Sequence, residues 1–259
     1  MFPLKDNLRC QSFPWITLSL IVLNSCAYLW EVVQQANGNQ INVMQFLMIP
    51  AFIINAFHSG DPILIKEALV SIFGAMFMHG SLMHLLGNML FLFVFGKAVE
   101  NRLGKAWFLG FYLLAGLAAA AAQIGSNPAS LVPMLGASGA IAGVLGAYLI
   151  FWPKAEITVL FQIFPFRIRA YWFLVAWFAM QWLPLLSGGQ AATGHLSNWA
   201  TLGAITTAGS GGVAYWAHIG GFVCGVIVSG IVRLFKPDSD VCYIPSDCPP
   251  CDSEGRGRN

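Results

Sequence analysis

Long stretches without any charged residue constrain this chain more than any other feature. One stretch covers the 63 residues 170–232, and another covers the 48 residues 106–153. A helix needs about 20 apolar residues to cross the hydrocarbon core of a bilayer, so each stretch can hold two crossings. Charged residues make up only 9% of the chain, against about a quarter in soluble domains. Because hydrophobic residues reach 57%, the sequence predicts an integral membrane protein.

Charges and turn-forming residues divide the chain into six predicted spans. Gly125-Ser126-Asn127-Pro128 breaks the stretch 106–153, and a segment rich in Gly, Ser, Thr and Asn at residues 187–212 breaks the stretch 170–232. The predicted spans lie near residues 14–30 and 81–95, with two more within residues 106–153 and two within residues 170–232. The expected fold class is therefore all-α, a polytopic membrane protein with a six-transmembrane-helix bundle.

This organisation gives one membrane domain over residues 1–235 and a tail over residues 236–259. The tail contains Cys242, Cys248 and Cys251 among polar residues and prolines. Three thiolates are one ligand short of a closed zinc site, so we expect a disordered cytoplasmic tail, with zinc binding as the alternative. No cofactor is expected.

The positions of lysine and arginine predict the orientation of the spans. Of the 13 such residues, only Lys66 falls between the first and second spans, on the side opposite all the others. Cytoplasmic loops carry the excess of positive charge in most membrane proteins, so both termini are expected in the cytoplasm. We expect a multi-pass protein of a prokaryotic cell (inner) membrane, with the first span retained as a signal anchor. Cleavage after Ser25-Cys26-Ala27 is the alternative, and it would leave five spans.

Two glycine-rich motifs place Ser138 and His218 inside these apolar stretches, 80 positions apart. Polar groups in hydrocarbon are costly and therefore usually functional. A serine beside a histidine can act as a nucleophile, because the imidazole takes the hydroxyl proton. Ser138 alone would be interpreted as a helix N-cap, and His218 alone as an interhelical hydrogen-bonding residue. Both are expected at the outer ends of their spans, and this shared depth favours a catalytic pair.

Small residues beside the serine and the histidine predict a close approach of their helices. Gly136 and Gly139 flank Ser138, and Gly221 shares a helical face with His218. Faces of small residues let membrane helices come near enough for an imidazole to reach a hydroxyl. Ser138 is also expected at a helix N-terminus, where free backbone N–H groups can stabilise an oxyanion.

No carboxylate is positioned to complete a triad. The spans carry no Asp or Glu at their centres, and Glu31, Glu100 and Glu156 lie outside the uncharged stretches. All three are expected too far from the outer end to reach His218. The sequence therefore predicts a Ser-His dyad in which packing and local hydrogen bonds orient the imidazole.

A second polar cluster lies at the start of the second span. His84 and Asn88 are four residues apart and share one helical face, so both can offer side-chain N–H groups to the negative oxygen of a tetrahedral intermediate. His79 is expected to begin the helix and to brace the preceding loop. A metal site would combine His79, His84 and His218, but no carboxylate or thiolate joins them, so no metal is expected.

With these motifs the chain resembles the rhomboid family of intramembrane serine proteases. The resemblance covers residues 14–235 and depends on the order of three motifs. They are His79 to Asn88 on the second span, Gly136 to Gly139 on the fourth, and Ala217 to Gly221 on the sixth. Many members also carry Trp-Arg in the first outer loop, where this chain has Val70 and Ser71.

The resemblance implies an intramembrane serine endopeptidase. Ser138 would be the nucleophile and His218 the general base and acid. His84, Asn88 and the backbone N–H of Ser138 would form the oxyanion hole. Substrates would be single-span membrane proteins, cut near the outer end of their helix. Some members have an aromatic residue four positions after the serine, stacked on the histidine, and because this chain has Ala142 there, another residue must hold the imidazole.

Substrate and water must reach such a site from the membrane and its surface. We hypothesise that the fifth span and residues 187–212 form a lateral gate for the substrate helix. An inactive family member that binds membrane proteins would not need both Ser138 and His218, and a transporter would show an inverted repeat. A net charge of +2 without a basic stripe argues against nucleic acid. The expected partners are transmembrane protein substrates and the lipid bilayer.

Overall fold

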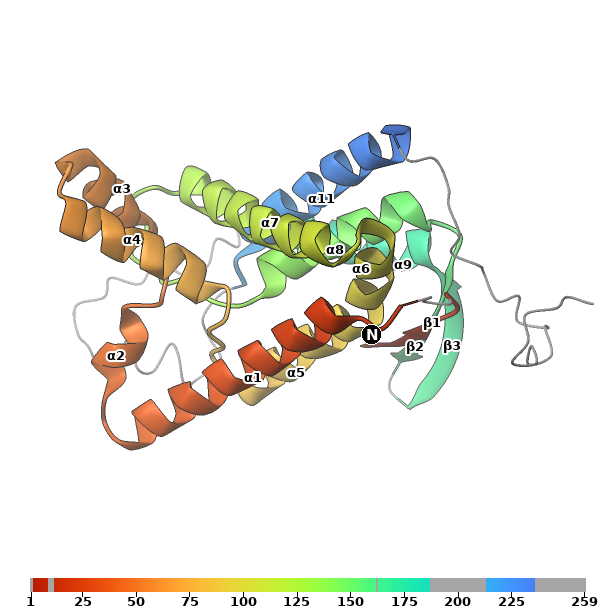
Figure 1. The fold of residues 1–259 in the computed structure, drawn as a ribbon, viewed down its shortest axis with the longest axis horizontal. Helices are drawn as coiled ribbons and strands as arrows, with labels where there is room; N and C mark the ends of the chain where they lie inside the picture. The colour runs from red at the N-terminus through yellow and green to blue at the C-terminus, as the bar shows by residue number, and fades with distance from the viewer. Residues whose placement is uncertain (1, 9–11, 162, 187–212, 236–259) are drawn as a thin grey trace, which may run out of the picture.

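The computed structural model describes residues 2–8, 12–161, 163–186 and 213–235. The predicted tail and residues 187–212 lie outside the described residues. Within the described ranges the chain is mostly helical, with one small sheet (Figure 1). In chain order the elements are β1 (Phe2–Asp6), α1 (Trp15–Ala36), α2 (Gln40–Met44), α3 (Pro50–Ser59), α4 (Pro62–Ala75), α5 (Leu82–Phe91), the π-helical segment η1 (Leu92–Gly96), α6 (Lys97–Leu103), α7 (Lys105–Ser126), α8 (Ser138–Phe151), β2 (Glu156–Phe161), β3 (Phe164–Arg169), α9 (Ala170–Leu186) and α11 (Tyr215–Phe235).

In the described part of the chain, four helices are long and apolar enough to cross a membrane. They are α1, the continuous helix from α5 through η1 to α6, α7 and α11. The chain is therefore an integral membrane protein, as predicted. Two shorter apolar helices, α8 and α9, occupy the places of the predicted fourth and fifth spans. The total of six crossings stays a prediction, because α8 has 14 residues where a full crossing takes about 20.

The second span extends beyond the charge that was expected to end it. The helix that begins with α5 passes Lys97, whose Nζ lies 3.0 Å from a carboxylate oxygen of Asp6 in β1. The Glu100 carboxylate accepts the backbone N–H groups of Ile16 and Thr17 at 3.0 and 2.7 Å, at the start of α1. Charges with such partners can be accommodated within a helix near the membrane edge, which an argument from charge-free gaps does not anticipate.

A three-stranded antiparallel sheet, in the order β1-β2-β3, lies at one end of the helices (Figure 1). The all-α prediction missed this sheet. β2 alternates polar and apolar residues, with Ile157 and Val159 fully buried in the main core. This period of two is the sequence signal of a strand, but it extends over only six residues between the predicted fourth and fifth spans. Asp6 ties the sheet to the helices, since it accepts the Tyr148 hydroxyl at 3.0 Å and pairs with Lys97.

The predicted loop between the first and second spans contains α2, α3 and α4, which lie at the end opposite the sheet (Figure 1). α3 and α4 pack around a second, smaller core that includes Met48, Ile53 and Ala68. Asp61 caps α4 by accepting the backbone N–H of Ile63 at 2.8 Å. This loop is therefore a folded unit, and its last residues lead directly into α5.

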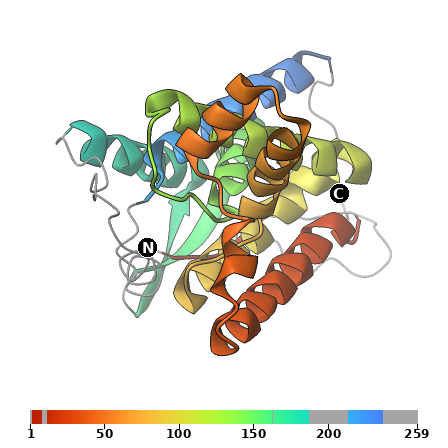
Figure 2. The same cartoon turned by 90° about the vertical axis from the view of Figure 1, so that its left-hand side faces the viewer.

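Among the described helices α8 is the most buried, with most of its residues enclosed by its neighbours. α11 packs most extensively against α8 and α7. α9 and α1 lie at opposite edges of the molecule in Figure 2, and α9 packs much less extensively against α11 and α8. The residues 138 and 218 singled out in the sequence thus lie on the tightly packed central helices, next to a loosely packed helix at the edge.

Candidate active site

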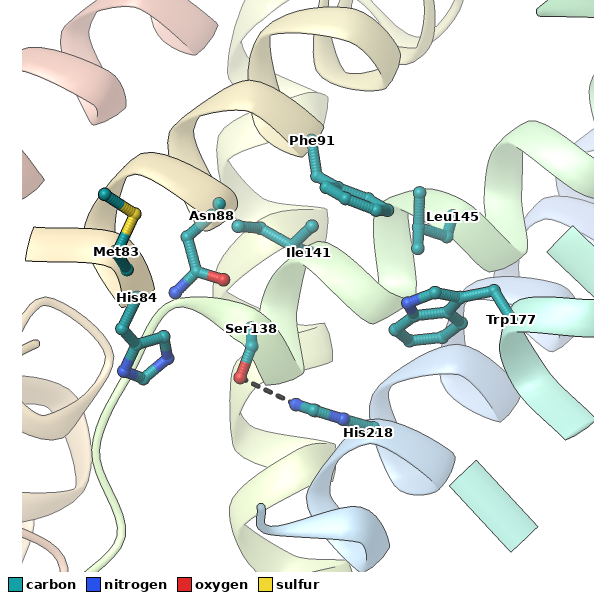
Figure 3. A pocket seen from close by; sticks show the side chains of 10 residues that line it. Met83, His84, Asn88, Phe91, Ser138, Ile141, Leu145, Trp177 and His218 are labelled. Carbon is teal, nitrogen blue, oxygen red and sulfur yellow. Dashed lines mark hydrogen bonds between the residues drawn. The ribbon is translucent and has the colours of Figure 1, made fainter. Parts of the chain in front are cut away.

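The starts of α8 and α11 bring Ser138 and His218 together (Figure 3). Ser138 is the first residue of α8, and His218 lies in the first turn of α11. The Nε2 atom of His218 lies 2.8 Å from Ser138 Oγ, which is a hydrogen-bond distance. Both side chains are half-buried, so they border a cavity rather than fill a core. This geometry permits proton transfer from the hydroxyl to the imidazole.

Four glycines set the separation between α8 and α11. A Cβ added at Gly221 would collide with the carbonyl oxygen of Gly139, and one added at Gly225 would collide with the carbonyl oxygen of Gly143. The two helices therefore meet backbone to backbone, which small residues allow. We call this contact the α8–α11 seam. It fixes the distance between the serine and the histidine, because helices in such contact cannot approach further or slide freely.

Two α9 side chains contact the His218 imidazole, one of them at Nδ1, the ring nitrogen that does not face Ser138. Gln181 Oε1 lies 2.8 Å from His218 Nδ1, and Gln181 Nε2 donates to the carbonyl oxygen of Trp177 at 3.0 Å. The Trp177 ring lies against the imidazole, with centroids 5.8 Å apart and planes inclined by 36°. These residues replace the aromatic side chain that Ala142 does not supply. Sequence reasoning missed them, and the available signal was a glutamine within an apolar helix.

A cavity of about 260 Å³ opens beside the hydrogen-bonded pair. Its walls come from α5, α8, α9 and α11. The lining residues are Met83, His84, Gly87, Asn88, Phe91, Ser138, Ile141, Leu145, Trp177 and His218. In Figure 3, His84 and Asn88 lie on the α5 side, with Ser138 between them and His218. The four predicted side chains thus border one cavity.

Asn88 is held by a chain of hydrogen bonds from the loop before α5. His79 Nδ1 lies 3.1 Å from the carbonyl oxygen of Phe77, which only accepts, so this nitrogen carries the hydrogen. His79 Nε2 then accepts from Asn88 Nδ2 at 3.0 Å. Burial, together with the smaller effect of the nearby His84, lowers the pKa of His79 to about 4. The neutral imidazole therefore binds one amide hydrogen of Asn88, and the second is left for the cavity.

The start of α5 differs from the prediction. The helix begins at Leu82 rather than at His79, because Ser81 caps it by accepting the backbone N–H of His84 at 3.2 Å. His79 instead lies in the preceding loop and is bonded to it. The polar cluster is therefore divided between a loop, which supplies support, and a helix, which supplies the cavity-facing groups.

Gly136 is needed both for its backbone conformation and for its lack of a side chain. Its φ of 117° is one that residues with a Cβ rarely adopt. A Cβ there would lie 2.8 Å from the His84 ring. The backbone N–H of Gly136 donates to the carbonyl oxygen of Ala75 at 2.7 Å. Gly136 thus anchors the segment before Ser138 to the end of α4 and leaves room for His84.

A family model described as Rhomboid domain matches residues 66–235, which include all of these side chains. The chain belongs to the rhomboid family. "Rhomboid protein 1, mitochondrial" of Saccharomyces cerevisiae is 32% identical over 162 residues, which make up 61% of this rhomboid and 40% of the yeast protein. "Putative rhomboid protease YdcA" of Bacillus subtilis is 40% identical over 72 residues, or 28% of this chain and 36% of that protein. "Presenilin-associated rhomboid-like protein, mitochondrial" of Bos taurus is 36% identical over 87 residues, which make up 33% of this chain and 23% of that protein.

The family match covers residues 66–235. This rhomboid spans less than half the length of each of these three relatives. The family model begins at Lys66 in α4, so β1 and α1 precede the matched region. The hydrogen-bonded Ser138 and His218 and the whole lining of the cavity lie inside it.

One carboxylate of this rhomboid lies closer to the site than the sequence indicated. Glu31 is 3% exposed, and its two carboxylate oxygens accept the backbone N–H of His79 at 3.2 and 2.9 Å. Glu31 was expected to lie too far from the outer end to reach His218; it lies in α1, which continues to Ala36, and binds the loop before α5 instead. In the described part of the chain no hydrogen bond joins Glu31 to His218. Glu31 therefore supports the loop that holds Asn88.

Two of the three histidines that were considered as metal ligands use their ring nitrogens in hydrogen bonds. His79 and His218 each use both ring nitrogens in hydrogen bonds. Within the ranges that the structure describes, no group of three His, Cys, Asp or Glu side chains could hold a metal ion. The tail residues Cys242, Cys248 and Cys251 fall outside those ranges.

Proposed function

We propose that this rhomboid is an intramembrane serine endopeptidase that hydrolyses peptide bonds in or near the transmembrane helices of single-span membrane proteins. The observation that carries the proposal is the 2.8 Å contact between Ser138 Oγ and His218 Nε2, at a cavity that His84 and Asn88 also line. A family member that only binds other membrane proteins would not need this contact. A serine and a histidine are sufficient to make a nucleophile when other contacts fix the imidazole.

In the first step, Ser138 Oγ attacks the carbonyl carbon of the scissile bond while His218 Nε2 takes the hydroxyl proton. The π electrons of the carbonyl move to its oxygen, which gives a tetrahedral intermediate with a negative charge. The imidazolium then donates its proton to the amine nitrogen, the C–N bond breaks, and the acyl group remains on the serine. One histidine therefore serves first as base and then as acid.

We assign stabilisation of the negative oxygen to three N–H donors. The backbone N–H of Ser138 has no partner within α8, because this residue begins the helix. Asn88 has one amide hydrogen that His79 does not use, and His84 borders the same cavity. A preorganised donor of this kind typically contributes about a hundredfold to a thousandfold in rate.

Water completes the reaction. His218 takes a proton from a water molecule, the water oxygen attacks the acyl carbon, and the proton passes to Ser138 Oγ as the ester bond breaks. The half-buried positions of Ser138 and His218 beside an open cavity are compatible with this access.

We also propose that both termini lie in the cytoplasm of a prokaryotic cell and that the site opens towards the outer side of its inner membrane. The support is the distribution of charge. Lys5, Arg167 and Arg169 belong to the sheet, whereas Lys66 belongs to α4 at the opposite end (Figure 1). The names of the yeast and bovine relatives assign those proteins to mitochondria, while a third relative is from a bacterium. A reporter at the N-terminus should be active on the cytoplasmic side and one at the Gly60 turn on the outer side, and the reverse pattern would refute this orientation.

The deciding experiment incubates the purified protein with a model single-span substrate. Ser138→Ala should lower cleavage by about four orders of magnitude or more, because the nucleophile is removed. Ser25→Ala is the matched control, since the Ser25 hydroxyl bonds the carbonyl oxygen of Ile21 in α1 and does not line the cavity. Equal amounts of product from the wild type and from Ser138→Ala would refute the proposed function.

A further inference from the structure

We propose that Gln181 is a positioning residue for His218 and that α9, through this contact, couples its own position to the reactivity of Ser138. This inference rests on the proposed proteolytic function. It adds a third member to the Ser-His dyad, supplied by the helix for which the sequence predicted a gating role.

The backbone of α9 determines which atom of the Gln181 amide faces the imidazole. The carbonyl oxygen of Trp177 only accepts hydrogen bonds, so the amide atom 3.0 Å from it must be Nε2. The other amide atom, Oε1, then lies 2.8 Å from His218 Nδ1. Because an amide oxygen also only accepts, Nδ1 carries the hydrogen and Nε2 keeps a lone pair. That lone pair faces Ser138 Oγ, as a general base requires.

Gln181 thus occupies the place of the carboxylate in a Ser-His-Asp triad. An amide can orient the imidazole and select its tautomer, but it brings no negative charge to stabilise the imidazolium. Gln181 is 7% exposed, and Trp177 covers one side of the ring, so both restrict access of water to this hydrogen bond. Among the hydrogen bonds of the described residues, the His218 side chain has two partners, Gln181 and Ser138. Without Gln181, the serine would therefore face a mixture of tautomers.

α9 is held less firmly than the helices that carry the dyad. Its contact with α11 consists of side chains, such as Phe178 stacked on Phe222 at 4.4 Å between centroids. Large apolar side chains on other faces of α9 are exposed. The α8–α11 seam, in contrast, is a backbone contact. A lateral displacement of α9 would therefore break the bond between Gln181 and His218 while leaving the distance between His218 and Ser138 unchanged.

This coupling gives the reaction an order. While α9 is displaced to admit a substrate helix, the imidazole loses its fixed tautomer and Ser138 is less nucleophilic. When α9 returns, the hydrogen bond re-forms and the attack can begin. The site is therefore least reactive while it is open to the bilayer.

A first experiment measures the rate at which a fluorophosphonate, a small probe that phosphonylates activated serines, labels Ser138. Gln181→Met keeps the size of the side chain but loses its acceptor, so labelling should slow by about tenfold to a hundredfold. Gln181→Glu keeps an acceptor at Nδ1 and should restore labelling at neutral pH. A carboxylate also stabilises the imidazolium, so the acidic limb of the labelling rate against pH should move to higher pH. Leu183→Ala, an exposed position on the same helix, is the control and should label at the wild-type rate.

Wild-type labelling rates in Gln181→Met, or an unmoved acidic limb in Gln181→Glu, would overturn the proposal. A purely structural role for Gln181 would not move that limb. The ¹⁵N resonances of His218 provide a readout that does not depend on proteolysis. They should report Nδ1–H in the wild type and a mixture of tautomers in Gln181→Met, and equal spectra would also overturn the proposal.

A second experiment tethers α9 to α11 with a short thiol crosslinker between Phe178→Cys and Phe222→Cys. The tether should leave fluorophosphonate labelling at or above the untethered rate, because it holds Gln181 beside His218. It should lower cleavage of a substrate that spans a bilayer, because the gate cannot open. Slower labelling in the tethered protein would contradict the coupling. Failure of the proposed function would look different, since the wild type itself would show no labelling that Ser138→Ala removes.

Discussion

The α8–α11 seam and the contact between α9 and α11 both act on His218, but they differ in kind. At the seam, Gly221 meets the carbonyl oxygen of Gly139, and no side chain separates the two helices. The contact with α9 consists of aromatic rings and the hydrogen bond that His218 donates to Gln181. The seam sets the distance between the imidazole and the serine, whereas α9 sets the orientation of the imidazole.

This difference indicates that distance and orientation are controlled separately in this rhomboid. Backbone contact is stiff, because close-packed atoms cannot interpenetrate. A single buried hydrogen bond can be broken at a cost of about 1–3 kcal/mol, which is accessible to a conformational change. The serine and histidine can therefore stay adjacent while the reactivity of the pair changes.

The strongest test of the comparison is Gly221→Ala. The added methyl group must push α11 away from the carbonyl oxygen of Gly139, which should destabilise the protein by about 1–3 kcal/mol. Because His218 moves with the helix, cleavage should fall by well over a hundredfold. Thermal unfolding in detergent micelles and cleavage of the model substrate measure the two effects.

Gly230→Ala is the matched control on the same helix. A Cβ at Gly230 would meet nothing within 4 Å, so this variant should keep the stability and activity of the wild type. Loss of stability with full activity in Gly221→Ala would contradict the assignment of distance to the seam. Gln181→Met should show the opposite pattern, with low activity and little loss of stability, and this contrast would establish the separation of the two roles.

A smaller effect is expected on the opposite wall of the cavity. Asn88→Ala removes one of three proposed oxyanion donors, so kcat should fall by about a hundredfold with little change in KM. Asn42→Ala removes an exposed amide in α2 and should have no effect on cleavage. A change confined to KM would indicate that Asn88 binds the substrate rather than the intermediate.

Much of the site could be predicted because its residues belong to short motifs. Ser138 and His218 are rare polar groups in charge-free stretches, and the glycines around them are typical of close helix packing. His84 and Asn88 follow from helical spacing. Gln181 and Trp177 could not be assigned in the same way, because their role depends on which face of α9 meets α11, and a helix that is apolar on all sides gives no indication of that face.

The fold, like the site, has features that the sequence predicts and features that it does not. Charge-free stretches locate the apolar helices, because hydrocarbon excludes unpaired charge. They fail where charges are paired, as at Lys97 with Asp6, and they give no information on β1 and β3. Glu31 was placed too far from the site for a related reason. A buried carboxylate can lie well inside a helix when a backbone N–H, here that of His79, binds it.

The smallest expected effect concerns pH and the support of Asn88. The pKa of His79 is about 4 in the folded protein, below the ordinary value of 6.5, because the ring is buried. Between these two values the unfolded state binds more protons than the folded state, so the free energy of unfolding decreases as the pH falls. The stability that the neutral His79 contributes is fully present above pH 6.5. Towards pH 4 it declines by up to about 1.4 kcal/mol for each pH unit.

His79→Gln tests this contribution, because glutamine does not titrate and its amide oxygen can still accept from Asn88. Thermal unfolding of both proteins at pH 7 and pH 5 gives the free energy of unfolding that each loses over this range. The difference between the two losses is the contribution of His79, because Glu31 and His84 titrate in both proteins. We expect the wild type to lose about 2 kcal/mol more than the variant. Equal losses would show that His79 is as accessible to protons in the folded protein as in the unfolded chain. The wall that carries Asn88 would then be loosely held, as α9 is, and only the seam would remain as the rigid part of the site.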